Sequence, residues 1–180
     1  MSYLGLHRHQ VKLSRHSTKW RALGEQAVAE LIALCGQPAL HVEHAGSTSV
    51  ADLDAKRILD LVVGLEDVCR FDNLRSTLVS AHYIYRGFQH GGIGHLFVRE
   101  SAPGVRTIRA HGVPYPSTDW NEYVCFRDLL KAKKIVKRDY PKLKLASATR
   151  FSLDRKAYTA SKHEFIQGVL RTMTDCYQAD

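Results

Sequence analysis

Apolar residues recur along the chain with two spacings, one typical of helices and one typical of strands. A repeat of about three to four residues predicts helices over 19–35, 49–53, 68–81, 143–149 and 154–174. Alternating or unbroken apolar positions predict strands over 10–13, 39–44, 58–64, 83–88, 95–99 and 105–111.

Several residues predict where individual helices begin and end. Gly36 and Pro38 are typical of the end of the first helix. Asp119, followed by Glu122, is similar to a capping box and predicts the start of another helix. Pro141 predicts a break in that helix, because proline lacks the N–H group that a helix interior needs.

The order of these elements predicts one domain over residues 1–180 of the α/β (α+β) class. The strand predicted over 58–64 is almost unbroken in its apolar character, as central strands covered on both faces are. The strands after it alternate like antiparallel ones, and the last third of the chain is helical. We therefore expect a mixed sheet flanked by helices and closed by a C-terminal helical layer.

The segment HAGSTSV, over residues 44–50, combines a glycine with three hydroxyl side chains. Glycine lets the backbone approach a phosphate closely, and the N–H groups that open a short helix point at a bound anion. Gly46, Ser47 and Thr48 are therefore candidates for holding phosphate. The alternative is a capped turn between a strand and a helix, with no ligand.

Asp60 is a single carboxylate within the apolar strand predicted over 58–64. An ionised carboxylate is costly there unless a metal ion or a cationic side chain neutralises it. Beside Ser47, Asp60 would hold Mg²⁺ against the phosphates of a nucleotide. The alternative is a structural ion pair with Lys56 or Arg57.

Motifs spread over nearly the whole chain resemble those of the GrpB family, within the nucleotidyltransferase superfamily and its polymerase-β-like fold. They are EHAGSTSV (43–50), AK (55–56), ILD (58–60) and FRDLL (126–130), together with Trp20, Tyr140, Lys144, Tyr158 and Lys162. The chain departs from the family pattern at ADL (51–53), where Pro-Gly-Leu is usual, and at Arg57, where proline often stands.

The first hypothesis is the activity that this resemblance implies. It is an enzyme that binds a nucleoside triphosphate with Mg²⁺ and transfers a nucleotidyl group to a small acceptor. The catalytic candidates are Asp60, Ser47 and His111, and Asp60 is also the candidate metal ligand. The candidates for binding substrate phosphate are Gly46, Ser47, Thr48, Lys56, Arg109, Arg127, Lys144, Tyr158 and Lys162. Four of these candidates have an open alternative, which is a role as a structural brace or a half-buried packing role. They are Arg127, Lys144, Tyr158 and Lys162.

Val62 stands where two-metal nucleotidyl transfer needs a second acid, so we expect at most one weak metal site. The second hypothesis is therefore a non-catalytic module that binds a nucleotide or another phosphorylated ligand. The third is a metabolite ligase or acyl-transfer enzyme that uses the same pocket, since a fold does not fix the chemistry.

The charge of the chain favours anionic partners. The net charge is +8, from 26 Lys and Arg against 18 Asp and Glu. Solvated helix faces also explain much of this excess. A small nucleotide is preferred over nucleic acid as the partner, because the sequence contains neither an aromatic RNA-binding motif nor a helix-turn-helix signature. The sequence leaves the oligomeric state open.

The cysteines, the histidines and the apolar runs argue against a zinc site, a disulfide framework and a membrane span. The four cysteines are too widely spaced to predict a zinc site or a disulfide framework. His44, His95 and His111 lie on predicted strands, where three separate hydrogen-bonded histidines are a better interpretation than a zinc site. The N-terminus lacks the apolar core of a signal peptide and no apolar run reaches the length of a membrane span, so we expect a cytoplasmic protein without a membrane partner.

Overall fold

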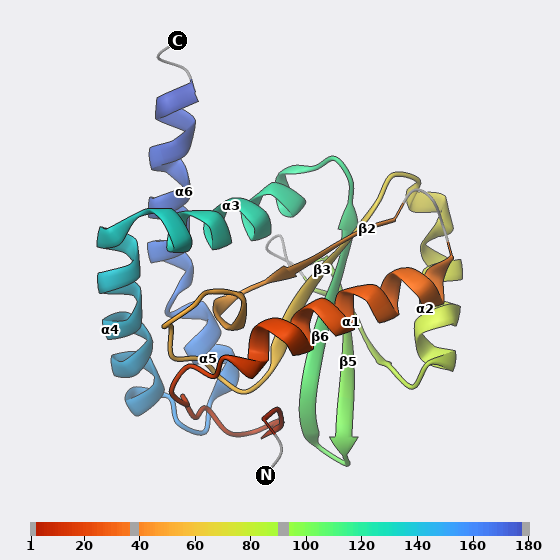
Figure 1. Cartoon of the computed structure of the whole chain (residues 1–180), viewed down its shortest axis with the longest axis horizontal. Helices are drawn as coiled ribbons and strands as arrows, with labels where there is room; N and C mark the ends of the chain where they lie inside the picture. The colour runs from red at the N-terminus through yellow and green to blue at the C-terminus, as the bar shows by residue number, and fades with distance from the viewer. Residues whose placement is uncertain (1–2, 37–39, 90–93, 178–180) are drawn as a thin grey trace.

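The computed structural model describes residues 3–36, 40–89 and 94–177, and Figure 1 shows a sheet with helices on both sides. The strands are β1 (Leu6–His7), β2 (Leu40–Ala45), β3 (Leu59–Leu65), β4 (Ile84–Gln89), β5 (Gly94–Ala102) and β6 (Val105–Pro114). The α-helices are α1 (Lys19–Cys35), α2 (Phe71–Ser80), α3 (Thr118–Ala132), α4 (Lys134–Arg150), α5 (Arg155–Ala160) and α6 (His163–Tyr177). Two 3₁₀ turns complete the structure, η1 (Ser47–Ser49) and η2 (Val68–Arg70).

The sheet is mixed, as expected. Its strand order is β2-β3-β6-β5-β4, and β1 pairs with the start of β6. β3 and β6 run parallel, with Asp60 opposite Arg109 and Val62 opposite His111. Because successive side chains of a strand point to opposite faces, these four residues share one face of the sheet.

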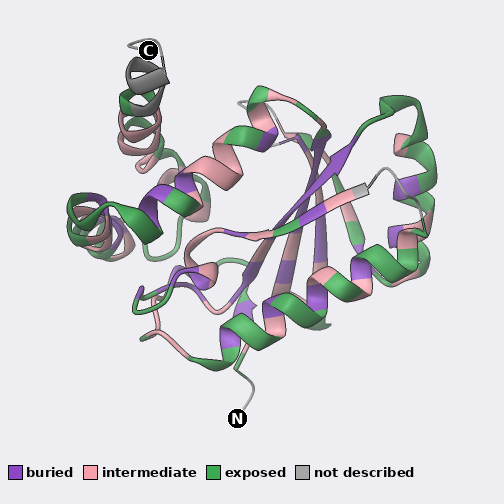
Figure 2. Cartoon of the chain, turned by 45° about the horizontal axis from the view of Figure 1, so that its top comes forward, coloured by how far each residue is buried: buried purple, intermediate pink, exposed green. Residues whose placement is uncertain are grey.

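Each face of the sheet is covered by a different group of helices. On one face, Leu31 of α1 and Leu78 of α2 pack with Leu61 of β3 in the largest buried cluster. On the other face, Trp120 of α3 packs against Val62 and its neighbours. Figure 2 shows the buried residues concentrated along the central strands, between these two layers. The prediction of a central strand covered on both sides is therefore confirmed.

A helical layer closes the C-terminal part of the chain, which also confirms the prediction. Phe126 of α3 and Tyr140 of α4 form a buried cluster with Val50 and Leu53, which follow η1. Partly buried residues of α6 pack against this cluster. The layer is thus anchored to the HAGSTSV segment itself.

The N-terminal prediction was wrong. Residues 10–13 form no strand, and Ser14 makes an isolated bridge with Ala55 instead. Val11 is buried, and its N–H donates to the carbonyl of Ser152 at 2.8 Å. The alternating pattern of this segment therefore reflects packing against the loop after α4. The short helix predicted over 49–53 is likewise replaced by η1, because Val50 already has an extended backbone.

The helix boundaries after residue 117 also differ from the prediction. Ser117, not Asp119, caps α3, and its hydroxyl accepts the N–H of Trp120 at 3.1 Å. Pro141 lies inside α4, and the break comes earlier, at Lys133, whose ψ is 107°. Tertiary packing outweighs the lost hydrogen bond, since α4 buries side chains on both sides of the proline.

The long helix predicted over 154–174 is divided into α5 and α6 by Ser161 and Lys162. The Ser161 hydroxyl donates to the carbonyl of Tyr158 at 2.9 Å at this break. Within the described residues, none of the helices combines the length and the apolarity needed to span a membrane.

Candidate functional site

The bend between β2 and η1 brings the backbone of Gly46 against Asp60. Gly46 has a φ of 67° and a ψ of −173°, a combination that is essentially restricted to glycine. A Cβ atom at this position would lie 2.8 Å from Asp60 Oδ2. The Ser49 hydroxyl donates to the Gly46 carbonyl at 2.6 Å and fixes the turn. The hydroxyl-rich segment and the carboxylate, 14 residues apart in sequence, are therefore adjacent.

Asp60 is paired with Arg109 across the parallel strands. Arg109 Nε donates to Asp60 Oδ1 at 2.7 Å, and Arg109 Nη2 forms an ion pair with the same oxygen at 2.5 Å. His111 Nε2 lies 3.9 Å from the same oxygen. Burial acts to raise the pKa of Asp60, but Arg109 and His111 outweigh it and hold this pKa well below its usual range. Asp60 is thus paired with Arg109, a partner that was not among the structural alternatives considered from the sequence.

One cavity of about 1070 Å³ opens beside this pair and the bend. It is lined by most of the candidates from the sequence, namely Gly46, Ser47, Thr48, Lys56, Asp60, Arg109, His111, Lys144, Tyr158 and Lys162. It is also lined by four cations that the sequence analysis did not single out, namely Arg8, Arg106, Arg155 and Lys156. Eight Lys and Arg side chains thus face two acids, Asp60 and Glu122.

The four missed cations come from segments remote from the HAGSTSV motif, between β1 and α1, in β6 and in α5. Arg155, for example, follows the Asp154 cap of a short helix and donates from Nη2 to the carbonyls of His7 and Gln10. No local pattern distinguishes such residues from cations on solvated surfaces, so only the tertiary structure identifies them.

Lys144 of α4 reaches the bend from the helical layer. Its side chain is buried, and Nζ donates to Ser47 Oγ at 3.2 Å and to the carbonyl of Asp54. Burial, followed by repulsion from Lys162, lowers the pKa of Lys144 to about 7. Lys144 therefore holds the Ser47 hydroxyl in place. It also contributes a poorly hydrated amino group to the lining of the cavity.

Two further ammonium groups lie near the ring of Tyr158. Nζ of Lys162 is 4.4 Å from the ring centroid, and Nζ of Lys56 is 4.9 Å from it. Burial and repulsion from Arg109 lower the pKa of Lys162 to about 8, and they lower the pKa of Lys56 well below its ordinary value. These shifts have two physical causes, the loss of water around each amine and the excess of positive charge nearby.

Arg127 does not line the cavity among the described residues, so its predicted role in phosphate binding is corrected. Its Nη1 donates to Glu43 Oε2 at 2.7 Å and to the carbonyl of His44 at 3.2 Å. Its Nε donates to Asp128 at 2.8 Å. Arg127 is the structural brace that the sequence left open, and it ties α3 to β2.

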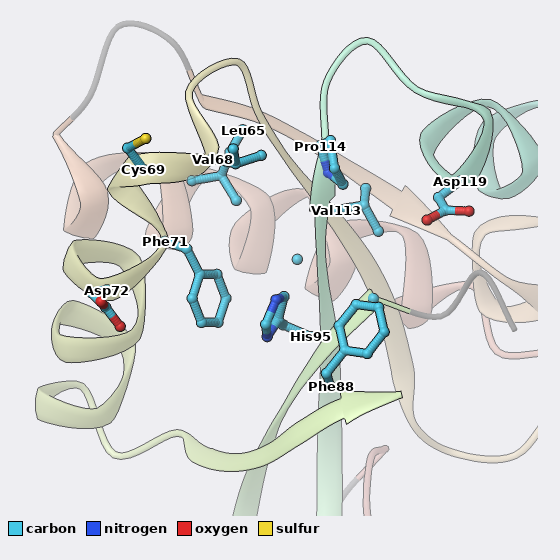
Figure 3. A pocket seen from close by; sticks show the side chains of 12 residues that line it. Leu65, Val68, Cys69, Phe71, Asp72, Phe88, His95, Val113, Pro114 and Asp119 are labelled. Carbon is cyan, nitrogen blue, oxygen red and sulfur yellow. The ribbon is translucent and has the colours of Figure 1, made fainter. Parts of the chain in front are cut away.

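The three strand histidines do not converge. His44 Nε2 bonds Thr48 Oγ1 at 2.9 Å under α1, where burial lowers the pKa of His44 to about 4. His95 bonds Tyr85 at 2.8 Å and lines a second cavity of about 390 Å³, where Figure 3 shows it between Phe71 and Phe88. Only His111 of the three lines the larger cavity. The described residues contain no cluster of three or more His, Cys, Asp or Glu that could hold a metal ion.

The oxygen ligands available near Asp60 determine how well Mg²⁺ fits there. Magnesium takes about six oxygen ligands and is usually held by one or two carboxylates together with phosphates. Val62 is fully buried, and its cross-strand neighbour Glu43 is bonded to Arg127. Oδ1 of Asp60 is engaged by Arg109. The described residues therefore do not fit a two-carboxylate magnesium site.

Proteins of similar sequence and fold identify the family of this chain. Residues 10–172 match the family model described as GrpB protein. The glutamate-rich protein GrpB of Alkalihalophilus pseudofirmus is 30% identical over 173 residues, which cover 94% of this chain and 99% of that protein. A crystal structure of conserved protein GrpB from Enterococcus faecalis has a TM-score of 0.80 at 24% identity, over 93% of this chain and 99% of that one.

A more distant likeness concerns the fold alone. A structure of the Cid1 poly(U) polymerase has a TM-score of 0.55 at 13% identity, over 82% of this chain and 49% of that one. The fold is thus nucleotidyltransferase-like, as the sequence motifs implied. Since the family model covers nearly all of the sequence and a curated relative aligns along its whole length, the chain belongs to the GrpB family.

Proposed function

We propose that the large cavity binds a nucleoside triphosphate or a metabolite that carries the same polyphosphate group. The observation that carries this proposal is the charge of the lining, eight Lys and Arg side chains against two acids. Such an excess in a concave, partly dry space attracts and retains polyanions. The phosphates lie against the bend, where Ser47 and Lys144 are already held together.

The size and the apolar lining of the cavity fit the remainder of a nucleotide. Ligand pockets typically measure about 300–1,000 Å³, and this cavity of about 1070 Å³ is at the upper end of that range. Phe88, Tyr123 and Phe126 add apolar and aromatic surface to the lining of the cavity. A flat base can pack there while the phosphates face the cations.

Isothermal titration calorimetry with ATP, GTP, CTP, UTP and inorganic tripolyphosphate tests this proposal. Lys144→Met removes a cation from the bend, and Lys142→Met removes an exposed cation from the same helix as a matched control. A hydrogen bond to a charged group is worth about 1.5–3 kcal/mol, so Lys144→Met weakens binding by about tenfold or more. Unchanged affinity in Lys144→Met, or no binding by the natural chain, contradicts the proposal.

Nucleotidyl transfer to a small acceptor is the second candidate, and the position of His111 favours it. His111 lines the cavity with Nε2 3.9 Å from the ionised carboxylate of Asp60, an arrangement suited to a general base. In this reaction an acceptor hydroxyl attacks the α-phosphorus and forms an O–P bond. The bond between the α-phosphorus and the oxygen that bridges it to the β-phosphorus breaks, pyrophosphate leaves with that oxygen, and the hydroxyl proton passes to His111.

Release of pyrophosphate in the presence of candidate acceptors separates this enzyme from a binding module. His111→Gln is expected to abolish turnover while changing the Kd of ATP by less than about threefold, because the imidazole acts on the acceptor and not on the phosphates. Absence of turnover with every acceptor, together with tight ATP binding, favours the binding module.

A further inference from the structure

Lys56 carries a buried ammonium group that no hydrogen bond in the described structure satisfies. The residue is 9% exposed, and Nζ has no hydrogen-bond partner among the described residues. Nζ lies 4.9 Å from the centroid of the Tyr158 ring. An ammonium group that has lost its water without gaining a partner is expensive to maintain, so such a group marks a place that an anion completes.

The neighbouring charges increase this requirement. Lys162 approaches the same Tyr158 ring, and Arg109 and Arg155 also act to lower the pKa of Lys56. Arg155 Nε and Nη1 likewise have no hydrogen-bond partner among the described residues. Asp60 offsets these cations in part, and its Oδ1 is already bonded to Arg109. The excess of positive charge therefore stays uncompensated until an anion enters.

This arrangement is the reverse of a magnesium site. In a magnesium site, carboxylates bind the metal and the metal binds the phosphates. Here cationic side chains occupy the same cavity, and the carboxylate is the counter-ion of one of them. Lysine and arginine bind phosphate directly, without an intervening ion.

We infer that the polyphosphate of the ligand binds directly to Lys56 and Lys162 without a divalent metal ion, and that Asp60 acts as a positioning residue for Arg109. This inference rests on the proposed function, since it names how the same cavity recognises its ligand. Lys56 and Lys162 are then specificity-determining residues for highly charged phosphates, and ligands with one phosphate bind more weakly.

The metal dependence of ATP binding tests the inference apart from the proposed function. ATP is titrated by calorimetry in buffer with EDTA and in buffer with Mg²⁺. The inference predicts that binding in EDTA is at least as tight as in Mg²⁺. Binding that is tenfold or more tighter with Mg²⁺ overturns the inference and leaves the proposed function intact, whereas absence of binding in both buffers overturns the proposed function.

Variants of Lys56 and Asp60 distinguish ligand recognition from a merely structural role. Lys56→Met removes the unsatisfied charge, so we expect a higher melting temperature for the free protein and ATP binding at least tenfold weaker. Lys142→Met, which changes an exposed lysine, is expected to alter neither quantity. Asp60→Asn is expected to change the Kd of ATP by the same factor in EDTA and in Mg²⁺, because Asp60 positions Arg109 and binds no metal ion. A lower melting temperature or an unchanged Kd in Lys56→Met, or a loss of affinity in Asp60→Asn that appears only in the Mg²⁺ buffer, overturns the inference.

Discussion

The backbone of Gly46 passes very close to the side chain of Asp60. A Cβ atom at position 46 would lie 2.8 Å from Oδ2 of Asp60 and 2.9 Å from Cβ of Asp60. This contact joins the hydroxyl-rich bend to the strand that carries the carboxylate. The HAGSTSV segment and the strand that carries Asp60 therefore pack as one structural unit. This close packing requires a residue without a side chain at position 46.

Gly46→Ala is expected to destabilise the protein through two effects. The backbone conformation of Gly46 costs about 1–3 kcal/mol for any other residue. The overlap with Asp60 adds about 1–3 kcal/mol, as overpacking of a well-packed site does. Urea unfolding measures the sum, and ATP affinity falls with it.

Gly36→Ala is the matched control for this substitution. Gly36 also has a positive φ, 55°, but a Cβ atom there meets nothing within 4 Å. Its replacement is therefore expected to cost only the backbone strain, about 1–2 kcal/mol. Equal losses of stability in the two variants would show that the contact between Gly46 and Asp60 is unimportant.

Arg127→Met is expected to lower stability while leaving ligand binding unchanged. The side chain is 11% exposed and is bonded to Glu43, Asp128 and a carbonyl of β2. Loss of these bonds leaves polar groups unsatisfied and costs about 1–3 kcal/mol of the free energy of unfolding. Arg138→Met removes an exposed ion pair with Asp139 and is expected to cost less than about 1 kcal/mol. A tenfold change in the Kd of ATP would contradict the assignment of Arg127 as a brace.

Stability and ligand affinity are expected to depend on pH in opposite directions. The pKa of Lys144 is about 7 and that of Lys162 about 8 in the folded protein, against about 10.4 in an unfolded chain. At pH values between the folded-state and unfolded-state pKa values, the unfolded chain binds more protons than the folded protein. The free energy of unfolding of the ligand-free protein therefore rises with pH. Affinity for ATP falls over the same interval, because a neutral amine attracts phosphate weakly.

Chemical unfolding and calorimetry at about pH 7, 8 and 9 measure both trends. The double variant Lys144→Met/Lys162→Met provides the control, since it lacks two of the lysines with lowered pKa values and is expected to reduce the slope of both curves, with Lys56 supplying the remainder. Stability that falls as the pH rises from 7 to 9 in the natural chain would be inconsistent with the lowered pKa values.

Elements with strong local patterns could be predicted from the sequence. The helix predicted over 19–35 has the bounds of α1, because its apolar stripe is continuous and Gly36 ends it in a left-handed conformation. The central strand was predicted within one residue of β3, because its apolar residues are uninterrupted. These signals are local and need no knowledge of the neighbouring elements.

Features that depend on packing could not be predicted in the same way. Pro141 is accommodated inside α4 because Tyr140 and Lys144 are buried against the rest of the protein. The FRD motif identifies Arg127 but does not reveal that its guanidinium turns toward Glu43. Arg155 reaches the cavity only through the arrangement of α5, which no periodicity in the sequence specifies.

A crystal structure with a non-hydrolysable ATP analogue, grown in EDTA, tests the central claim most directly. The account predicts that the triphosphate lies in the larger cavity, within hydrogen-bond distance of Lys56 and Lys162 and beside Ser47. A triphosphate in the smaller cavity around His95, or one held only by surface residues outside both cavities, would contradict it.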